Sequence, residues 1–103
     1  EGPQSLSPKN KIKLKSGMIV SNEPGYYKKG KFGIRIENLI YIKKNKFFEL
    51  TLVPIEKDLI NKNMLNKKEI IWINRYHTKV KNSLFKFMNP KEKANLITAC
   101  SPI

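Results

Sequence analysis

The chain has 103 residues, 40% of them hydrophobic, which suffices for one small domain with a modest core and excludes a second large one. Lysine and arginine total 21 against 8 acidic residues, so the formal net charge is +13, yet only Arg35 and Arg75 are arginines. A single cysteine excludes an internal disulfide, and no apolar run approaches the ~20 residues of a membrane-spanning helix, so we predict a cytoplasmic protein without a membrane partner.

The N-terminal half carries strand patterns separated by turn signals. Residues 1–15 predict a loop with a short strand at Lys11–Leu14. An apolar, β-branched run predicts a strand from Met18 to Glu23. Pro24 lacks a backbone donor and must lie at a strand end, an edge or a bulge, and Gly25 permits a conformation that other residues resist. We therefore expect the backbone to turn or bulge just after Glu23.

A second strand is predicted from Phe32 to Ile42. Alternation places on one face of this strand Arg35, Glu37, Leu39 and Tyr41. Both faces are otherwise largely apolar, so we expect this strand at the centre of a sheet that is covered on both sides. After a Lys-Asn-Lys turn, a third strand is predicted over Phe47–Val53, closed by Pro54.

The C-terminal half has helical periodicity. Asn66 followed by Glu69 is typical of a capping box, and apolar residues at three- and four-residue spacing predict a long amphipathic helix that ends near Met88. Its apolar stripe comprises Ile70, Ile73, Tyr76 or His77, Val80, Leu84 and Phe87. Pro90 is expected to begin a short last helix that ends near Cys100.

The order of these elements, strands first and helices after, predicts an α+β fold. We expect an antiparallel sheet portion in residues 1–55 and a helical extension in residues 56–103. The lysines are spread over both parts, which favours a solvated basic surface and no specific nucleic-acid partner. A basic nucleic-acid-binding module and an oligomerisation module are the alternatives.

Two acidic residues stand in apolar runs on either side of a turn signal centred near Gly30. If the runs pair as an antiparallel hairpin, Glu23 and Glu37 lie opposite each other, with Cβ atoms about 4.5–5.5 Å apart. Carboxylates so close would share a proton or need a cation between them. Their oxygen atoms suit a divalent ion such as Mn²⁺ or Mg²⁺, and Arg35 is placed to pair with a carboxylate or orient a ligand. We favour a metal site; pairing of both acids with nearby basic side chains is the alternative.

Packing explains the other candidate groups. His77, the only histidine, lies on or beside the apolar stripe without a second ligand at metal-binding helical spacing, so we predict a packed side chain. Cys100 has no histidine near it in sequence and is predicted to be a packed or idle thiol. Helix packing, rather than stacking on bases, is expected for Trp72, Tyr76 and Phe85.

Four stretches of the chain resemble the C-terminal part of aminopeptidase P, the Xaa-Pro aminopeptidase of the pita-bread metallopeptidase group. They are Glu1–Pro3, Gly17–Tyr27, Phe32–Asn38 and Leu50–Ile55. The run Asn-Glu-Pro-Gly-Tyr-Tyr, a short turn and then Phe-Gly-Ile-Arg-Ile-Glu-Asn is highly specific. The tail is similar to the eukaryotic-type and related bacterial long forms through Trp72, Tyr76, His77, Pro102 and Ile103.

This resemblance implies part of a two-metal hydrolase, usually with manganese, that removes an N-terminal residue followed by proline and forms a homodimer. In the family two aspartates, a histidine and two glutamates hold the metals. Glu23 matches the glutamate that binds one metal and contacts the metal-bound water, and Glu37 matches the glutamate that bridges both metals. Arg35 matches the arginine that supports the ligand shell, and Tyr27 a tyrosine that lines the site. Xaa-Pro peptides are the implied substrates.

The resemblance also implies that the site is incomplete in this chain. Both aspartates, the ligand histidine and the substrate-contacting histidines of the family lie upstream, and the histidine of its His-Glu-Gly-Pro motif would precede Glu1. We therefore expect a C-terminal fragment of a cytosolic Xaa-Pro aminopeptidase that contributes two of five ligands and is inactive alone.

Overall fold

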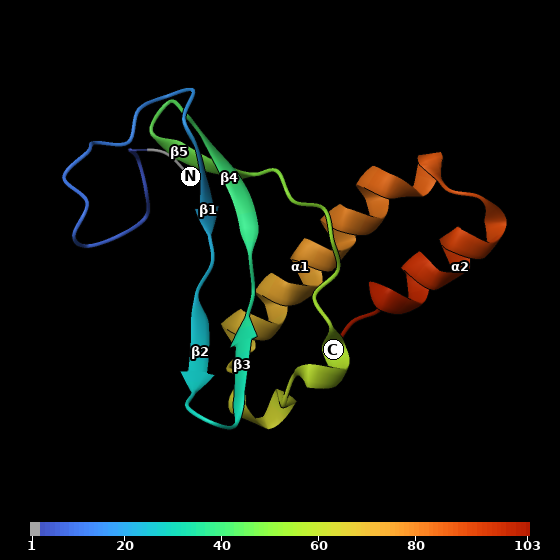
Figure 1. Cartoon of the computed structure of the whole chain (residues 1–103). Coiled ribbons are helices and arrows are strands. Elements are labelled where there is room, and N and C mark those ends of the chain that lie inside the picture. The colour runs from blue at the N-terminus through green and yellow to red at the C-terminus, as the bar shows by residue number, and fades with distance from the viewer. Residues whose placement is uncertain (1–2) are drawn as a thin grey trace. The chain divides into compact units, whose positions relative to one another are not determined.

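A computed structural model describes residues 3–103, so the part of the resemblance that rests on Glu1 and Gly2 lies outside the described residues. The chain forms two compact units, Glu1–Thr51 and Leu52–Ile103, which we call the strand unit and the helical unit (Figure 1). The predicted division into domains after residue 55 stays a prediction. No helix within residues 3–103 combines the length and the apolar character that crossing a membrane requires.

The strand unit contains two antiparallel sheets that share one long hairpin. Its strands are β1 (Ile19–Asn22), β2 (Gly25–Lys28), β3 (Phe32–Arg35), β4 (Asn38–Lys43) and β5 (Lys46–Glu49). The three-stranded sheet has the order β1-β4-β5, and β2 pairs with β3. Figure 1 shows β2 following β1 and β3 leading into β4, so the two arms of the hairpin run through both sheets.

The hairpin is interrupted near Pro24. Asn22 pairs with Asn38 on one side of the interruption and Gly25 with Arg35 on the other, so each arm skips the same number of residues and there is no bulge. The Pro24 carbonyl accepts a hydrogen bond of 3.3 Å from the Ile36 amide. Because proline has no N–H to return, the ladder breaks here. Of the three positions predicted for Pro24, the structure shows a strand end, between β1 and β2. The single strand predicted from Phe32 to Ile42 is wrong: it is β3 and β4.

Two other strand predictions also need correction. Residues 11–14 form no strand because the Asn10 side chain organises a loop, accepting from the Ile12 amide at 2.9 Å and donating to the Pro3 carbonyl at 2.9 Å. The third strand ends at Glu49 rather than Val53. Its ladder stops because the Leu39 amide donates to the Thr51 hydroxyl, at 2.8 Å, in place of a backbone carbonyl.

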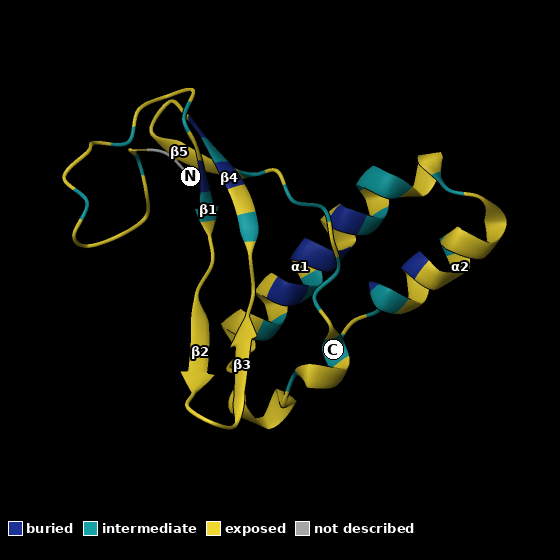
Figure 2. Ribbon diagram, viewed as in Figure 1, coloured by how far each residue is buried: buried dark blue, intermediate teal, exposed yellow. Residues whose placement is uncertain are grey.

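Burial in the strand unit follows the predicted alternation in β4 but not in β3. Ile40 and Ile42 are buried together with Val20, whereas Leu39 is 44% exposed. Every residue of β2 and β3 is exposed (Figure 2). The central position is therefore confirmed for β4, but the expected cover on both faces of a strand from Phe32 to Ile42 is wrong for the described part of the chain.

The helical unit contains two capped α-helices. Asn66 caps α1 (Lys67–Leu84): its side chain accepts from the Glu69 amide at 3.0 Å, and the Glu69 carboxylate accepts from the Asn66 amide at 2.8 Å, so the predicted capping box is confirmed. Asn89 and Glu92 form a second box at the start of α2 (Pro90–Ala99). The short 3₁₀ turns are η1 (Lys57–Leu59), η2 (Lys62–Met64) and η3 (Phe85–Phe87).

The long helix ends earlier than predicted. It stops at Leu84 and tightens into η3, whose last turn is closed by a hydrogen bond from the Met88 amide to the Phe85 carbonyl. The tightening precedes Asn89, which must be extended to cap α2, with φ −72° and ψ 170°. The core of the unit is formed by Tyr76, Val80, Leu96 and Cys100.

Candidate metal centre

The register of the long hairpin brings Glu23 and Glu37 opposite each other. The pairs Asn22–Asn38 and Gly25–Arg35 flank them symmetrically, and the turn between the arms contains Gly30, whose φ is +67°. Glycine adopts this left-handed conformation without strain, so the turn falls where the sequence predicts it. Side chains two residues apart on one arm lie on one face, and that face carries both glutamates and Arg35.

Arg35 lies between the two carboxylates. Its Nη1 atom is 3.7 Å from Oε2 of Glu23, and its Nε atom is 3.5 Å from Oε2 of Glu37. The side chains of Glu23, Glu37 and Arg35 are 47%, 44% and 51% exposed, so these ion pairs contribute little to stability. In the structure both acids thus pair with a basic side chain, the arrangement given above as the alternative to a metal site, and Arg35 lies near one oxygen of each.

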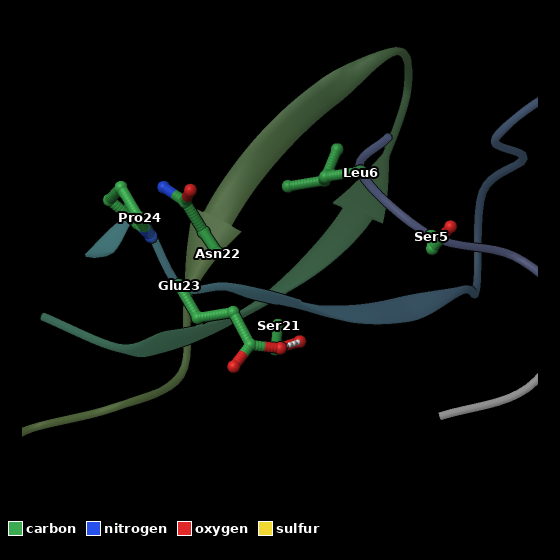
Figure 3. Close-up of a pocket in the computed structure, with 6 residues that line it drawn as sticks. All are labelled: Ser5, Leu6, Ser21, Asn22, Glu23 and Pro24. Atoms are coloured by element: carbon green, nitrogen blue, oxygen red, sulfur yellow. Dashed lines mark hydrogen bonds between the residues drawn. The ribbon is translucent and has the colours of Figure 1, made fainter. Parts of the chain in front are cut away.

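The second oxygen of Glu23 has a separate partner. Ser21, in β1, donates a hydrogen bond of 2.8 Å to Oε1 of Glu23 (Figure 3). Glu23 is thus held at both oxygens, by a hydroxyl and by a guanidinium. A hollow on this face is lined by both glutamates and Arg35 together with Ile19, Val20, Ser21 and Leu39. A neighbouring hollow, drawn in Figure 3, reaches Glu23 from the side of Ser5 and Leu6.

Tyr27 completes this group of side chains. Tyr27 is the largest influence that raises the pKa of the Arg35 guanidinium, ahead of Glu37 and Glu23. Tyr27 is 66% exposed and lies on the arm opposite Arg35, two residues along from Gly25. The four predicted site residues therefore come together in the structure.

Sequence reasoning did not identify Ser21 as part of this group. Strand alternation could have indicated it, because residue 21 lies two positions before Glu23 in a predicted strand and therefore lies on the same face. The conformational freedom of Gly25 is not used in the structure. Its φ is not positive; positive values occur among the described glycines only at Gly17 and Gly30. The space that Gly25 leaves for Tyr27 is the structural reason for glycine there.

The donor set suits part of a metal site. Two half-exposed carboxylates face one hollow, and oxygen ligands match divalent ions such as Mn²⁺ and Mg²⁺. Within residues 3–103, however, no three His, Cys, Asp or Glu side chains come together as a metal site would require. The arrangement fits two ligands of a larger centre.

The histidine and the cysteine are placed as the sequence predicts. His77 is fully buried in the helical unit, and its Nε2 atom accepts a hydrogen bond of 3.0 Å from the Ile55 amide. Burial lowers the pKa of His77, and the Lys57 ammonium lowers it further. Cys100 is buried, which raises the pKa of its thiol and keeps it protonated and unreactive. Both are packed side chains.

Comparison with known families places the chain among metallopeptidases. Residues 1–44 match metallopeptidase family M24, and residues 44–103 match the C-terminal region of peptidase M24. Xaa-Pro aminopeptidase 1 of Dictyostelium discoideum is 44% identical over 93 residues, which cover 78% of this chain and 15% of that protein. Aminopeptidase P1 of Arabidopsis thaliana is 35% identical over 118 residues, covering all of this chain and 18% of that protein.

A solved structure shows the same fold. X-prolyl aminopeptidase from Caenorhabditis elegans, described as a cytosolic enzyme with a di-nuclear active site, matches 87% of this chain with a TM-score of 0.72 and 36% identity. The match confirms the predicted α+β fold as a portion of a pita-bread aminopeptidase fold. The chain spans 17% of that structure and less than a fifth of the two relatives. By these matches, the chain belongs to metallopeptidase family M24 and corresponds to the C-terminal region of its members.

Proposed function

We propose that this chain supplies the C-terminal part of a cytosolic Xaa-Pro aminopeptidase, an enzyme that removes an N-terminal residue followed by proline. The observation that carries the proposal is the convergence of Glu23, Glu37, Arg35 and Tyr27 on one face, in a chain similar to enzymes of that name. Assembly as a homodimer and Xaa-Pro peptides as substrates belong to the same proposal.

Glu23 and Glu37 would hold a pair of divalent ions, for which we propose manganese. Such a pair, when bound, supplies a water nucleophile at neutral pH and polarises the scissile carbonyl. Within this chain, Arg35 separates the two carboxylates and holds one oxygen of each, which keeps them from repelling each other. Ser21 holds the remaining oxygen of Glu23, and the Tyr27 hydroxyl lies beside Gly25, the cross-strand partner of Arg35. The chain's own residues thus orient the two ligands in advance.

The test is whether this chain can complete an active site. Residues 1–103 replace the corresponding C-terminal part of the Dictyostelium relative, and hydrolysis of a peptide with proline second is measured with added Mn²⁺. We expect an active chimera that loses activity on Glu37→Gln and keeps it on Glu49→Gln, the matched removal of a carboxylate from β5. A chimera that folds and binds substrate but has the same activity with and without Glu37 contradicts the proposal. The chain alone is expected to show no turnover.

A further inference from the structure

The ring of Tyr27 lies against two glycines that have no backbone reason to be glycine. A Cβ atom placed on Gly25 would lie 2.6 Å from the Tyr27 hydroxyl oxygen, and one placed on Gly33 would lie 2.7 Å from its Cδ1 atom. Both distances are shorter than real Cβ contacts, so a side chain at either position requires the Tyr27 ring to move. Because Gly33 pairs with Tyr27 and Gly25 with Arg35, the two glycines form a contiguous bare strip of backbone under the ring. We call this strip the Tyr27 seat.

The seat lowers the intrinsic stability of the strands that carry it. Neither glycine has a positive φ, and a glycine inside a strand removes a side chain that could pack and adds flexibility to the unfolded chain. Glycines at two neighbouring positions of a two-stranded sheet are therefore unfavourable unless another side chain fills the space that they leave. The ring of Tyr27 uses it.

The position of the Tyr27 ring on the seat determines where its hydroxyl group lies. Tyr27 is 66% exposed, so solvent alone would allow its side chain several rotamers. Backbone contact with the seat leaves the hydroxyl beside Gly25, the residue that pairs with Arg35. Arg35 in turn lies within 3.7 Å of Glu23 and 3.5 Å of Glu37. The seat thus places the Tyr27 hydroxyl next to the cross-strand partner of Arg35, and Arg35 pairs with both carboxylates.

We propose that Gly25 and Gly33 are positioning residues of the metal site, which fix the Tyr27 ring and, through it, the Arg35 guanidinium between the two glutamates. This inference rests on the proposed function, because it assigns the seat a role in metal binding. A side chain at either position would displace the ring and leave Arg35 held by the glutamates alone.

The first measurement tests the contact between the Tyr27 ring and the two glycines, and it requires no metal. An aromatic ring stacked on a glycine shifts the Hα resonances of that glycine upfield, so the spectrum of the 103-residue chain should show this shift at Gly25 and Gly33. Tyr27→Ala should abolish it, and Tyr27→Phe should retain it. Gly30→Ala is the matched control: it strains the same hairpin through its φ of +67°, but its Cβ meets nothing within 4 Å, so the shifts should persist. Absence of the shifts in the unmodified chain overturns the proposal.

The second measurement is the Mn²⁺ affinity of the same variants built into the chimera with the Dictyostelium relative, because the described part of the chain alone offers only two ligands. Binding is followed by electron paramagnetic resonance of the free ion. Gly33→Ala should weaken binding about 10- to 100-fold, the range for residues that orient metal ligands, while Gly30→Ala should leave it unchanged. Combining Gly33→Ala with Tyr27→Ala should weaken binding no further than Tyr27→Ala alone, because the glycine acts through the ring. Additive losses, or unchanged affinity in Gly33→Ala, overturn the role of the seat.

A Glu37→Gln variant separates this inference from the proposed function. If Glu37→Gln abolishes Mn²⁺ binding and Gly33→Ala does not weaken it, the metal site stands and the seat proposal fails. If Glu37→Gln leaves binding unchanged, the bound ion is elsewhere; the proposed metal ligands and the seat's role in metal binding then both fail.

Discussion

The Ser21 hydroxyl donates a hydrogen bond of 2.8 Å to Oε1 of Glu23, the carboxylate oxygen that does not face Arg35. This bond and the ion pair act on different oxygens, so together they fix the plane of the carboxylate. A ligand oriented in this way loses less conformational entropy when it binds an ion.

Ser21→Ala should therefore weaken Mn²⁺ binding by about 2- to 10-fold, the effect of one net hydrogen bond of about 0.5–1.5 kcal/mol. Ser21→Thr, which keeps the hydroxyl, should restore most of the affinity. Ser16→Ala is the control, since the Ser16 hydroxyl accepts a hydrogen bond from the Lys44 amide in the same unit and touches neither glutamate. Equal Mn²⁺ affinities of the chimera with and without Ser21→Ala, measured by calorimetry, would contradict the prediction.

His77 should make the helical unit sensitive to mild acid. Burial, and then the Lys57 ammonium, lower the pKa of His77 from its ordinary value of 6.5, so the folded unit holds the imidazole neutral. Above pH 6.5 both folded and unfolded chains are neutral at this residue and its contribution is complete. As the pH falls below 6.5, the unfolded chain binds a proton that the folded chain resists, so the free energy of unfolding falls by at most about 1.4 kcal/mol per pH unit until the folded-state pKa is passed.

Urea unfolding followed by far-ultraviolet circular dichroism between pH about 7 and 5.5 measures this dependence. His77→Gln keeps an acceptor for the Ile55 amide but does not titrate, so its stability should change much less over the same range. Because His77 is the only histidine in the chain, no other imidazole obscures the comparison. Parallel pH profiles for the two chains would refute the assignment.

Lys57 should stabilise the end of α2. Its Nζ atom donates to the Thr98 carbonyl at 2.8 Å, to the Ser101 carbonyl at 3.3 Å and also to the Ser101 hydroxyl. A cation at a helix C-terminus is favoured by the helix dipole and by the unpaired carbonyls of the last turn. We expect Lys57→Met to lower the unfolding free energy of the helical unit by about 1 kcal/mol.

Two signals distinguish this effect from a general loss of charge. Hydrogen exchange at the Ser101 amide, which donates to the Thr98 carbonyl, should accelerate in Lys57→Met. The pKa of His77 should rise, because a neighbouring positive charge is removed. Lys62→Met, in η2, serves as the control; if it produces the same two changes, the contacts of Lys57 are not their cause.

The sequence predicted those features that depend on short-range chemistry. The capping box of Asn66 and Glu69 is recognisable in the sequence because both partners lie within one helical turn. The opposition of Glu23 and Glu37 was predictable because a turn near Gly30 fixes the register of both arms. Features that depend on unpaired backbone groups were harder to predict from the sequence. The apolar alternation of residues 32–42 continues through the break, which is caused by the missing amide of Pro24 on the opposite arm.

The candidate site likewise contains some residues that the sequence identified and others that it did not. Glu23, Glu37 and Arg35 carry charge and stand out in apolar runs, so their types and spacing indicated a site before the structure did. Ser21 and Gly33 carry no charge. Strand alternation places Ser21 on the face of Glu23, but its hydrogen bond and the contact of Gly33 with the Tyr27 ring appear only in three dimensions. The early end of β5 has a similar cause, since the Thr51 hydroxyl replaces a backbone acceptor across the ladder.

The turn between β4 and β5 offers a test of backbone strain in the strand unit. Lys44 and Asn45 both have positive φ, 49° and 58°, as a two-residue type I′ hairpin requires. Asparagine tolerates this conformation and glycine adopts it without strain. Asn45→Gly should therefore stabilise the strand unit by about 0.5 kcal/mol, whereas Asn45→Val should destabilise it by about 1–2 kcal/mol.

The readout is amide hydrogen exchange at Ile42, on the strand next to this turn. Exchange should slow in Asn45→Gly and accelerate in Asn45→Val. Asn82→Gly provides the matched comparison, because residue 82 lies inside α1, where glycine costs about 1 kcal/mol. The same substitution should therefore lower the stability of the helical unit. If Asn45→Gly accelerates exchange at Ile42, residue 45 does not carry the backbone strain that its φ of 58° indicates.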